Sequence, residues 1–180
     1  MNLLKTKPTL DSSSSIFVCV DIQEKLYNIM HKKEKLLKNA NLLLEASKIL
    51  NIDSIILEQY PKGLGKSVVN VNTKVIEKLS FSAFGESLFC KEIEAKQNII
   101  FFGIESHICI RESSLDAKDR GFNVFVIEDS CSSVNKNNHK NALKELSLKN
   151  ITITNTQSIL FSFLLTCKDD CFKQISALIK

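Results

Sequence analysis

The sequence contains little glycine and proline, with five residues of the first and two of the second among 180. The two stretches in which glycine is prominent, residues 62–65 (KGLG) and 103–107 (GIESH), match neither the P-loop nor the GxGxxG pattern. Glycine is therefore too sparse for a phosphate cradle of either kind. No linker and no internal repeat divides the chain, which predicts a single domain over residues 16–180 after a polar lead-in at residues 1–15.

Long apolar runs are also missing from the sequence. No stretch approaches the roughly 18 apolar residues that a membrane-spanning helix needs, and no secretory signal is evident. We therefore expect a cytoplasmic protein with no membrane partner. The formal charge of +4 comes from lysines scattered along the chain and not from one dense patch. This predicts no nucleic-acid partner and leaves a nucleic-acid role as the weakest alternative.

Metal-binding spacings are absent as well. None of the six cysteines forms a Cys-x-x-Cys pair, and the three histidines lie far apart in the sequence. We expect no metal site and no cofactor. In a chain of this length without a secretory signal, reduced thiols are a better interpretation of six cysteines than three disulfides.

What the sequence does contain is a regular alternation of apolar segments and amphipathic ones. Buried strands are predicted at residues 16–20, 53–57, 98–102, 122–127 and 151–153. Helices are predicted at residues 35–50, 86–95, 108–120 and 138–148, with one or two more at the chain end, while residues 74–79 fit a strand or a helical turn. This order indicates an α/β fold with a parallel sheet covered on both faces, which binds ligands at the carboxyl ends of its strands.

Two residues with useful chemistry lie just beyond predicted strands. Asp21 directly follows the strand at residues 16–20, where a carboxylate is costly to bury unless it is partnered or used, although it would also suit a helix cap. Cys109 begins the helix after the strand at residues 98–102, where the positive helix end favours a thiolate. A structural buried cysteine is the alternative interpretation of Cys109.

Two further residues are weaker candidates when taken alone. Lys78 precedes the segment FSAF at residues 81–84, and a solvated side chain is its default interpretation. His107 lies two residues before Cys109, which is too near in sequence for the usual base of a cysteine nucleophile. We expect His107 to form a wall of the pocket.

Taken together, these segments resemble a known pattern. The segments VDIQ at 20–23, KLSFSAF at 78–84 and GIESHICI at 103–110 resemble the isochorismatase-like cysteine hydrolase superfamily. The segments EQYPKGLG at 58–65 and EDSCSS at 128–133 most resemble its isochorismatase-domain-containing subgroup of unassigned activity. The similarity extends over nearly the whole chain.

The resemblance implies a three-layer α/β/α fold with a six-stranded parallel sheet. It implies that Cys109 is the nucleophile, Asp21 the general base and Lys78 their positive neighbour. It also implies a cis peptide bond between Glu105 and Ser106, with an oxyanion hole formed by N–H groups near Ser106 and Cys109.

Several other expectations accompany this resemblance. Gln23, Phe81, Phe84 and His107 would line the substrate pocket, and the protein would form a homo-oligomer, a dimer or larger. Nicotinamidases of the superfamily carry histidine metal ligands after the second strand. Residues 58–61 read EQYP and contain no histidine, so a metal site of that kind is not expected.

The sequence thus predicts a cysteine hydrolase that acts on a small amide or related acyl substrate. Catalysis would use Asp21, Lys78 and Cys109 and pass through a thioester intermediate. The alternative is a catalytically silent domain of the same fold that acts as a protein-binding module.

Overall fold

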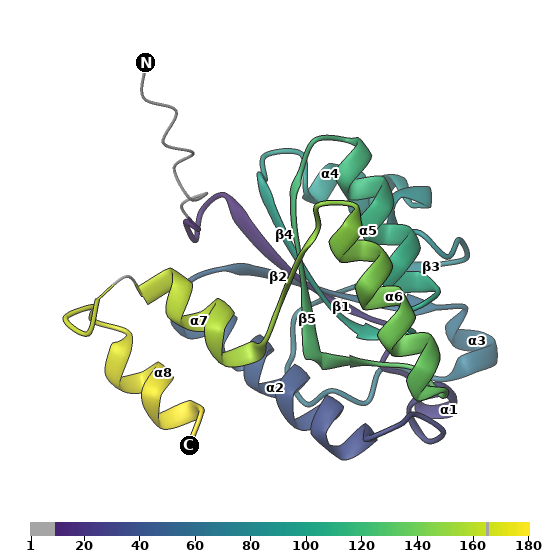
Figure 1. The fold of residues 1–180 in the computed structure, drawn as a ribbon, viewed down its shortest axis with the longest axis horizontal. Coiled ribbons are helices and arrows are strands. Elements are labelled where there is room, and N and C mark those ends of the chain that lie inside the picture. The colour runs from purple at the N-terminus through teal and green to yellow at the C-terminus, as the bar shows by residue number, and fades with distance from the viewer. Residues whose placement is uncertain (1–9, 165) are drawn as a thin grey trace.

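The computed structural model describes residues 10–164 and 166–180 (Figure 1). Its centre is a six-stranded sheet in which all strand pairs are parallel and the strands lie in the order β3-β2-β1-β4-β5-β6. The strands are β1 (Ser15–Val20), β2 (Asp53–Gln59), β3 (Lys74–Lys78), β4 (Asn98–Ile104), β5 (Asn123–Ser132) and β6 (Thr152–Thr154). The predicted six-stranded parallel sheet is confirmed.

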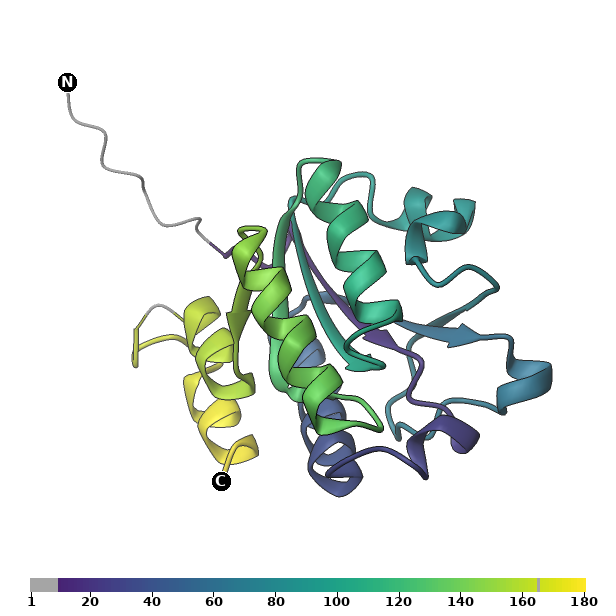
Figure 2. The ribbon, with the colours of Figure 1, turned by 45° about the vertical axis from the view of Figure 1, so that its right-hand side comes forward.

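Helices cover both faces of the sheet (Figures 1 and 2), as predicted for the three-layer architecture. One layer holds α2 (Lys33–Ile49), α7 (Thr156–Leu164) and α8 (Phe172–Leu178), which contact one another. The other layer holds α5 (Cys109–Asp119) and α6 (Lys136–Leu148), with the 3-10 turn η1 (Ala83–Gly85) and α4 (Ser87–Glu92) beside α5. Two short helices, α1 (Glu24–Tyr27) and α3 (Pro61–Leu64), follow β1 and β2.

The central strands are apolar on both sides because each side meets a helix layer. Every residue of β1 and β4 is buried, which explains why their sequences read as unbroken apolar runs. Phe17 on β1 meets Phe102 and Phe163 edge to face, with ring centroids 6.3 Å and 5.9 Å apart. These aromatic contacts link both central strands to α7.

Four details differ from the elements predicted from sequence. The strand predicted at 122–127 continues as β5 to Ser132, because Cys131 and Ser132 pair with the end of β4 after a register shift. The helix predicted at 86–95 is the shorter α4, and α3 lies within a stretch predicted as loop. Of the predicted lead-in at residues 1–15, residues 1–9 lie outside the described range, and β1 begins at Ser15.

The strand order reverses between β1 and β4. The chain leaves β1 through α2 to reach β2 on one side, and it leaves β4 through α5 to reach β5 on the other side. In open parallel sheets a crevice forms at this reversal, beyond the carboxyl ends of the two strands. Asp21 and Cys109 both lie at this edge. Among the described residues, no helix has the length and apolar character to cross a membrane.

Candidate active site

Asp21 is held at the crevice by an unusual backbone conformation. Its φ is +53°, a left-handed value that aspartate tolerates better than most residues. Its N–H donates to the Leu57 carbonyl at 3.0 Å, which extends the pairing of β1 with β2 by one residue. The side chain is fully buried. The capping interpretation is wrong, because Gln23 occupies the N-cap position of α1.

Lys78, the last residue of β3, forms an ion pair with Asp21. Its Nζ lies 2.8 Å from Oδ2 of Asp21, and both side chains are 0% exposed. The same Nζ donates to Oε1 of Gln59 at 2.6 Å and to the carbonyl of Ser80 at 3.3 Å. Three acceptors therefore surround an ammonium group that has three N–H bonds. The interpretation of Lys78 as a solvated side chain is wrong.

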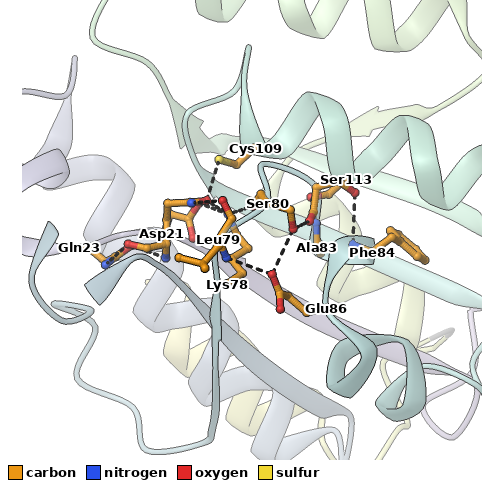
Figure 3. A network of polar contacts seen from close by, with 12 residues as sticks. Asp21, Gln23, Lys78, Leu79, Ser80, Ala83, Phe84, Glu86, Cys109 and Ser113 are labelled. Carbon is orange, nitrogen blue, oxygen red and sulfur yellow. Dashed lines mark hydrogen bonds and ion pairs between the residues drawn. The ribbon is translucent and has the colours of Figure 1, made fainter. Parts of the chain in front are cut away.

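The turn after Lys78 is fixed by its own polar contacts (Figure 3). The Glu86 carboxylate accepts hydrogen bonds from the N–H of Leu79 at 3.0 Å and from Oγ of Ser80 at 3.2 Å. The bond from the Leu79 N–H is the main cause that lowers the pKa of Glu86. The N–H of Ala83 donates to Oγ of Ser113 at 3.0 Å, which ties this turn to α5. The turn that carries Lys78 and the helix that carries Cys109 are thus connected.

Cys109 is the first residue of α5 and is 7% exposed. Its Sγ lies 4.0 Å from Oε1 of Gln59, and Figure 3 shows the sulfur directed toward the ends of the Asp21 and Lys78 side chains. The Asp21 carboxylate faces Lys78 and Cys109, and both contacts favour its charged form. Neither of its oxygens, however, has a described hydrogen-bond partner in ordinary geometry. A buried carboxylate with unused acceptor capacity is suited to take a proton from a neighbouring group.

Burial controls the protonation of this cluster. Desolvation raises the pKa of Asp21, and the ammonium group of Lys78 opposes the rise. Desolvation, reinforced by the Asp21 charge, also raises the pKa of Cys109 to about 12. The expectation that the helix end favours a thiolate is therefore wrong for the resting site. Cys109 rests as a thiol because burial beside a carboxylate outweighs the helix end.

The loop between β4 and Cys109 departs from the predicted arrangement. The cis peptide bond joins Ile104 to Glu105, one bond before the predicted position between Glu105 and Ser106. The pairing of Ile104 with Ser132 continues β4 up to this bond. The N–H of Ser106 then donates to the Ser132 carbonyl at 2.8 Å, so it is already occupied in this structure.

The first turn of α5 provides a free donor at the site. The N–H groups of Ile108 and Ile110 donate to the carbonyl of Glu105 at 3.0 Å and 3.2 Å. The carboxylate of Glu105 accepts from the N–H of Val134 at 3.0 Å. No backbone acceptor within the described part of the chain meets the N–H of Cys109. Among the residues predicted for the oxyanion hole, Cys109 is therefore the one with an available N–H.

Two of the predicted pocket residues have structural contacts. Gln23 is 0% exposed, and its Nε2 donates to the carbonyls of Gln59 at 3.0 Å and Gly65 at 2.6 Å. It therefore holds the end of β2. The ring of Phe84 packs against Phe89 and Phe122, and its place in the pocket stays a prediction.

The other two predicted pocket residues lie nearer the surface. The side chain of Phe81 is 61% exposed. The Nδ1 atom of His107 lies 3.0 Å from Oγ of Ser133, and its Nε2 lies 3.3 Å from Nδ2 of Asn138. The contacts of His107 therefore join the loop after β4 to the start of α6.

One residue with contacts to the cluster was missed by the sequence reasoning. Gln59 is the last residue of β2 and reaches both Lys78 and Cys109 through its side-chain oxygen. Its position at the carboxyl end of a strand, here β2, was the available signal. The neighbouring Glu58 instead accepts from the N–H of Ser67 at 2.7 Å.

Within the described ranges no group of three or more His, Cys, Asp or Glu side chains is placed to hold a metal ion. All six cysteines are free, as predicted.

The chain was compared with family models and with curated proteins, and both comparisons find relatives. The family model described as the isochorismatase domain matches residues 15–158. Isochorismatase domain-containing protein 2 of Danio rerio is 32% identical over 94% of this chain and 89% of its own length. Isochorismatase domain-containing protein 1 of the same fish is 31% identical over 98% of this chain, which spans only 65% of that longer protein.

A solved structure has nearly the same fold. The MAR1 ribonuclease of Caenorhabditis elegans superposes with a TM-score of 0.90 at 28% sequence identity, covering 94% of this chain and 91% of that one. The likeness therefore includes the sheet and both helix layers.

Proposed function

Because the chain belongs to the isochorismatase family, a family of hydrolase fold, we propose that it is a cysteine hydrolase that cleaves a small amide or related acyl compound. The observation that carries this proposal is the buried ion pair of Lys78 and Asp21 beside the thiol of Cys109. An ion pair at 0% exposure is costly to form, and stability alone is weak grounds for retaining one. The three side chains supply a nucleophile, a proton acceptor and a fixed positive charge.

The first half of the reaction forms a thioester. As Sγ of Cys109 bonds to the substrate carbonyl carbon, its proton passes to the Asp21 carboxylate. The carbonyl electrons move to oxygen, and the N–H of Cys109 donates to that oxyanion. Removal of one such donor typically raises the activation barrier by about 3 kcal/mol. The carbon–nitrogen bond then breaks, and the amine leaves with the proton from Asp21.

The second half returns the enzyme to its resting state. Water attacks the thioester carbon and gives a proton to Asp21. The carbon–sulfur bond breaks, the sulfur takes that proton, and the carboxylic acid is released. Lys78 transfers no proton in this sequence. Its ammonium remains within reach of the negative charge on Asp21 and on Cys109.

The test is to trap the thioester on Cys109. The protein is incubated with a panel of small amides and esters, and acyl adducts are located by intact-mass and peptide mass spectrometry. We expect an adduct on Cys109 and turnover that disappears in Cys109→Ala. Cys90→Ala is the matched control, since the Cys90 thiol contacts the Phe84 carbonyl at 3.6 Å and has no contact with the cluster. Turnover at the unmodified rate in Cys109→Ala would overturn the proposal and favour the protein-binding module.

RNA binding is a second candidate function. The similar nematode protein is named a ribonuclease, and this chain has a groove with a basic lining. The groove of about 310 Å³ is lined by residues at the starts of α2 and α6 and by the acidic Glu128 and Asp129 of β5. Its basic lining residues are His31, Lys32, Lys35, Lys136, His139 and Lys140. Binding of a fluorescent RNA oligonucleotide that weakens steeply with salt and is lost in a Lys136→Glu, Lys140→Glu variant would support it. Equal binding by that variant would refute it.

We also propose that copies of this chain associate near the site. Tyr60, Leu79 and Phe81 lie beyond the carboxyl ends of β2 and β3 and are 51%, 75% and 61% exposed. Exposed apolar side chains gathered at one edge are typical of interfaces. Light scattering coupled to size exclusion should give a mass above the 20.3 kDa of one chain. Leu79→Glu should lower this mass.

We further propose a reducing compartment such as the cytoplasm, which the free cysteines support.

A further inference from the structure

The side chain of Gln59 lies at the junction of the three proposed catalytic groups. Its Oε1 accepts a hydrogen bond from Nζ of Lys78 at 2.6 Å and lies 4.0 Å from Sγ of Cys109. Its Nε2 donates to the Leu79 carbonyl at 2.7 Å. Besides Asp21, Gln59 is thus a described side chain that contacts both Lys78 and the thiol.

The orientation of this amide is fixed by its partners. Nζ of Lys78 can only donate, so the atom that faces it must be the amide oxygen. The Leu79 carbonyl can only accept, so the atom that faces it must be the amide nitrogen. A flipped amide would lose both bonds. The oxygen of Gln59 therefore faces Lys78 and Cys109, and its position does not depend on how the amide was assigned.

The backbone of Gln59 is held just as firmly. Its N–H donates to Oε1 of Gln23 at 2.8 Å, and its carbonyl accepts from Nε2 of the same residue at 3.0 Å. Gln23 also bonds to the Gly65 carbonyl at 2.6 Å. The described contacts of the Gln23 side chain go to the backbone and not to the sulfur or the ammonium, so the chain offers a second buried glutamine with a structural role for comparison.

Two effects follow from this placement. The oxygen of Gln59 takes one of the three N–H bonds of Lys78, so it draws part of the ammonium away from the sulfur. Its own partial negative charge also faces the sulfur, which disfavours a thiolate there. Both effects keep the proton on Cys109 until a substrate carbonyl is in place to receive the electrons.

We propose that Gln59 is a positioning residue that fixes the Lys78 ammonium beside Asp21, away from the sulfur, and keeps Cys109 a thiol at rest. This inference rests on the proposed function, since it concerns the same three groups. It assigns the amide of Gln59 no proton transfer and no bond to substrate. Its effect on the reaction passes through Lys78 and through the charge beside the sulfur.

The test compares two substitutions whose effects on the thiol have opposite sign. Gln59→Met has a similar shape but no polar oxygen, so the ammonium is free to approach the sulfur. Gln59→Glu places a carboxylate 4 Å from the sulfur position and disfavours the thiolate. The rate of iodoacetamide alkylation at each cysteine is followed by peptide mass spectrometry between about pH 6 and 10.

We expect Cys109 in Gln59→Met to react about tenfold faster than wild type at a fixed pH, which corresponds to one unit of thiol pKa. In Gln59→Glu the alkylation rate of Cys109 should fall to about one tenth of the wild-type rate or lower. Gln23→Met is the comparison variant: it loosens the backbone of Gln59 but keeps the Gln59 side chain, so it should shift the pH profile of Cys109 less than Gln59→Met does. Cys19, which is 0% exposed in β1, reports global opening in every sample.

The outcomes separate this inference from the proposed function. Shifts in the same direction for both Gln59 variants, or no shift in either, would overturn it. A shift in Gln23→Met equal to that in Gln59→Met would also overturn it, because a structural effect would then suffice. Alkylation needs no substrate, so the expected opposite shifts combined with full turnover in Cys109→Ala would refute the proposed function and leave the role of Gln59 in thiol protonation standing.

Discussion

Replacing Lys78 by methionine tests the energetics of the buried ion pair. Methionine has a similar length but no charge, so Asp21 keeps its place and loses its positive neighbour. Both side chains are 0% exposed, with Nζ and Oδ2 2.8 Å apart. No described residue gives the carboxylate a well-aligned hydrogen bond that would replace the ammonium. A buried charge left without its partner typically costs about 3–5 kcal/mol of unfolding free energy.

The cost should depend on pH in a definite direction. Burial raises the pKa of Asp21 in the folded protein, and Lys78 opposes that rise. The folded state of Lys78→Met therefore holds the Asp21 proton to higher pH than the wild type does. A group with a raised folded pKa stabilises the fold when protonated, and this contribution is lost as pH rises through the folded value. The destabilisation of Lys78→Met should thus be largest near pH 8 and shrink as the pH falls toward the unfolded pKa of about 3.9.

Urea unfolding at about pH 5, 6.5 and 8 measures this difference, with the slope of each transition checked for two-state behaviour. Lys74→Met is the matched control, because Lys74 pairs with Glu92 at 2.6 Å while the side chains are 48% and 29% exposed. That pair should contribute about 1 kcal/mol or less. The double variant Asp21→Asn, Lys78→Met should recover part of the lost stability at pH 8. A loss in Lys78→Met no larger than in Lys74→Met, or one that is independent of pH, would refute the reasoning.

Two further substitutions test the framework of the site. Gly103→Ala should lower the free energy of unfolding, measured in urea, by about 4 kcal/mol or more. The reason is that φ of Gly103 is +127° and a Cβ there would overlap the backbone of Val20. Gly121→Ala, at φ +90° with open space around it, should cost only about 1 kcal/mol and separates the overlap from the dihedral strain. Arg111→Gln removes the contacts with the Glu145 carboxylate at 2.8 Å and 2.6 Å and should cost about 1 kcal/mol or less at pH 7. Since Arg111 lowers the pKa of Glu145, this difference should vanish as pH falls through that lowered value, and a constant difference would contradict the assignment.

The fold was predictable because its signals are local or periodic. Unbroken apolar segments identified β1 and β4, and the alternation of strands with helices indicated the parallel sheet. The same rule brought Asp21 and Cys109 together, since both follow central strands at the point where the strand order reverses. The last residues of β5 were missed because EDSCS carries no strand pattern. Pairing with β4 across a register shift decides their conformation.

The details of the site depend on contacts that no sequence spacing encodes. Phe84 was assigned to the pocket from its place in a motif, and only the structure shows that its ring packs against two neighbouring aromatic rings. The N–H of Ser106 was assigned to an oxyanion, but the carbonyl of Ser132 occupies it. Gln59 lies 19 residues from Lys78 and 50 from Cys109, so its role could emerge only from three-dimensional placement.

The raised pKa values of Asp21 and Cys109 agree with the proposed chemistry when the charge of the cluster is followed through it. At rest the site holds a carboxylate, an ammonium and a thiol, and its net charge is zero. After proton transfer it holds a carboxylic acid, an ammonium and a thiolate, and after attack the negative charge lies on the substrate oxygen. Each state contains one positive and one negative charge within the same buried region. Burial penalises both the Asp21 carboxylate and the Cys109 thiolate, so it raises the pKa of both groups. In the free energy of proton transfer from Cys109 to Asp21, these two penalties largely cancel. The thiol can thus be inert toward solvent at neutral pH and still reactive toward a carbonyl placed beside Lys78.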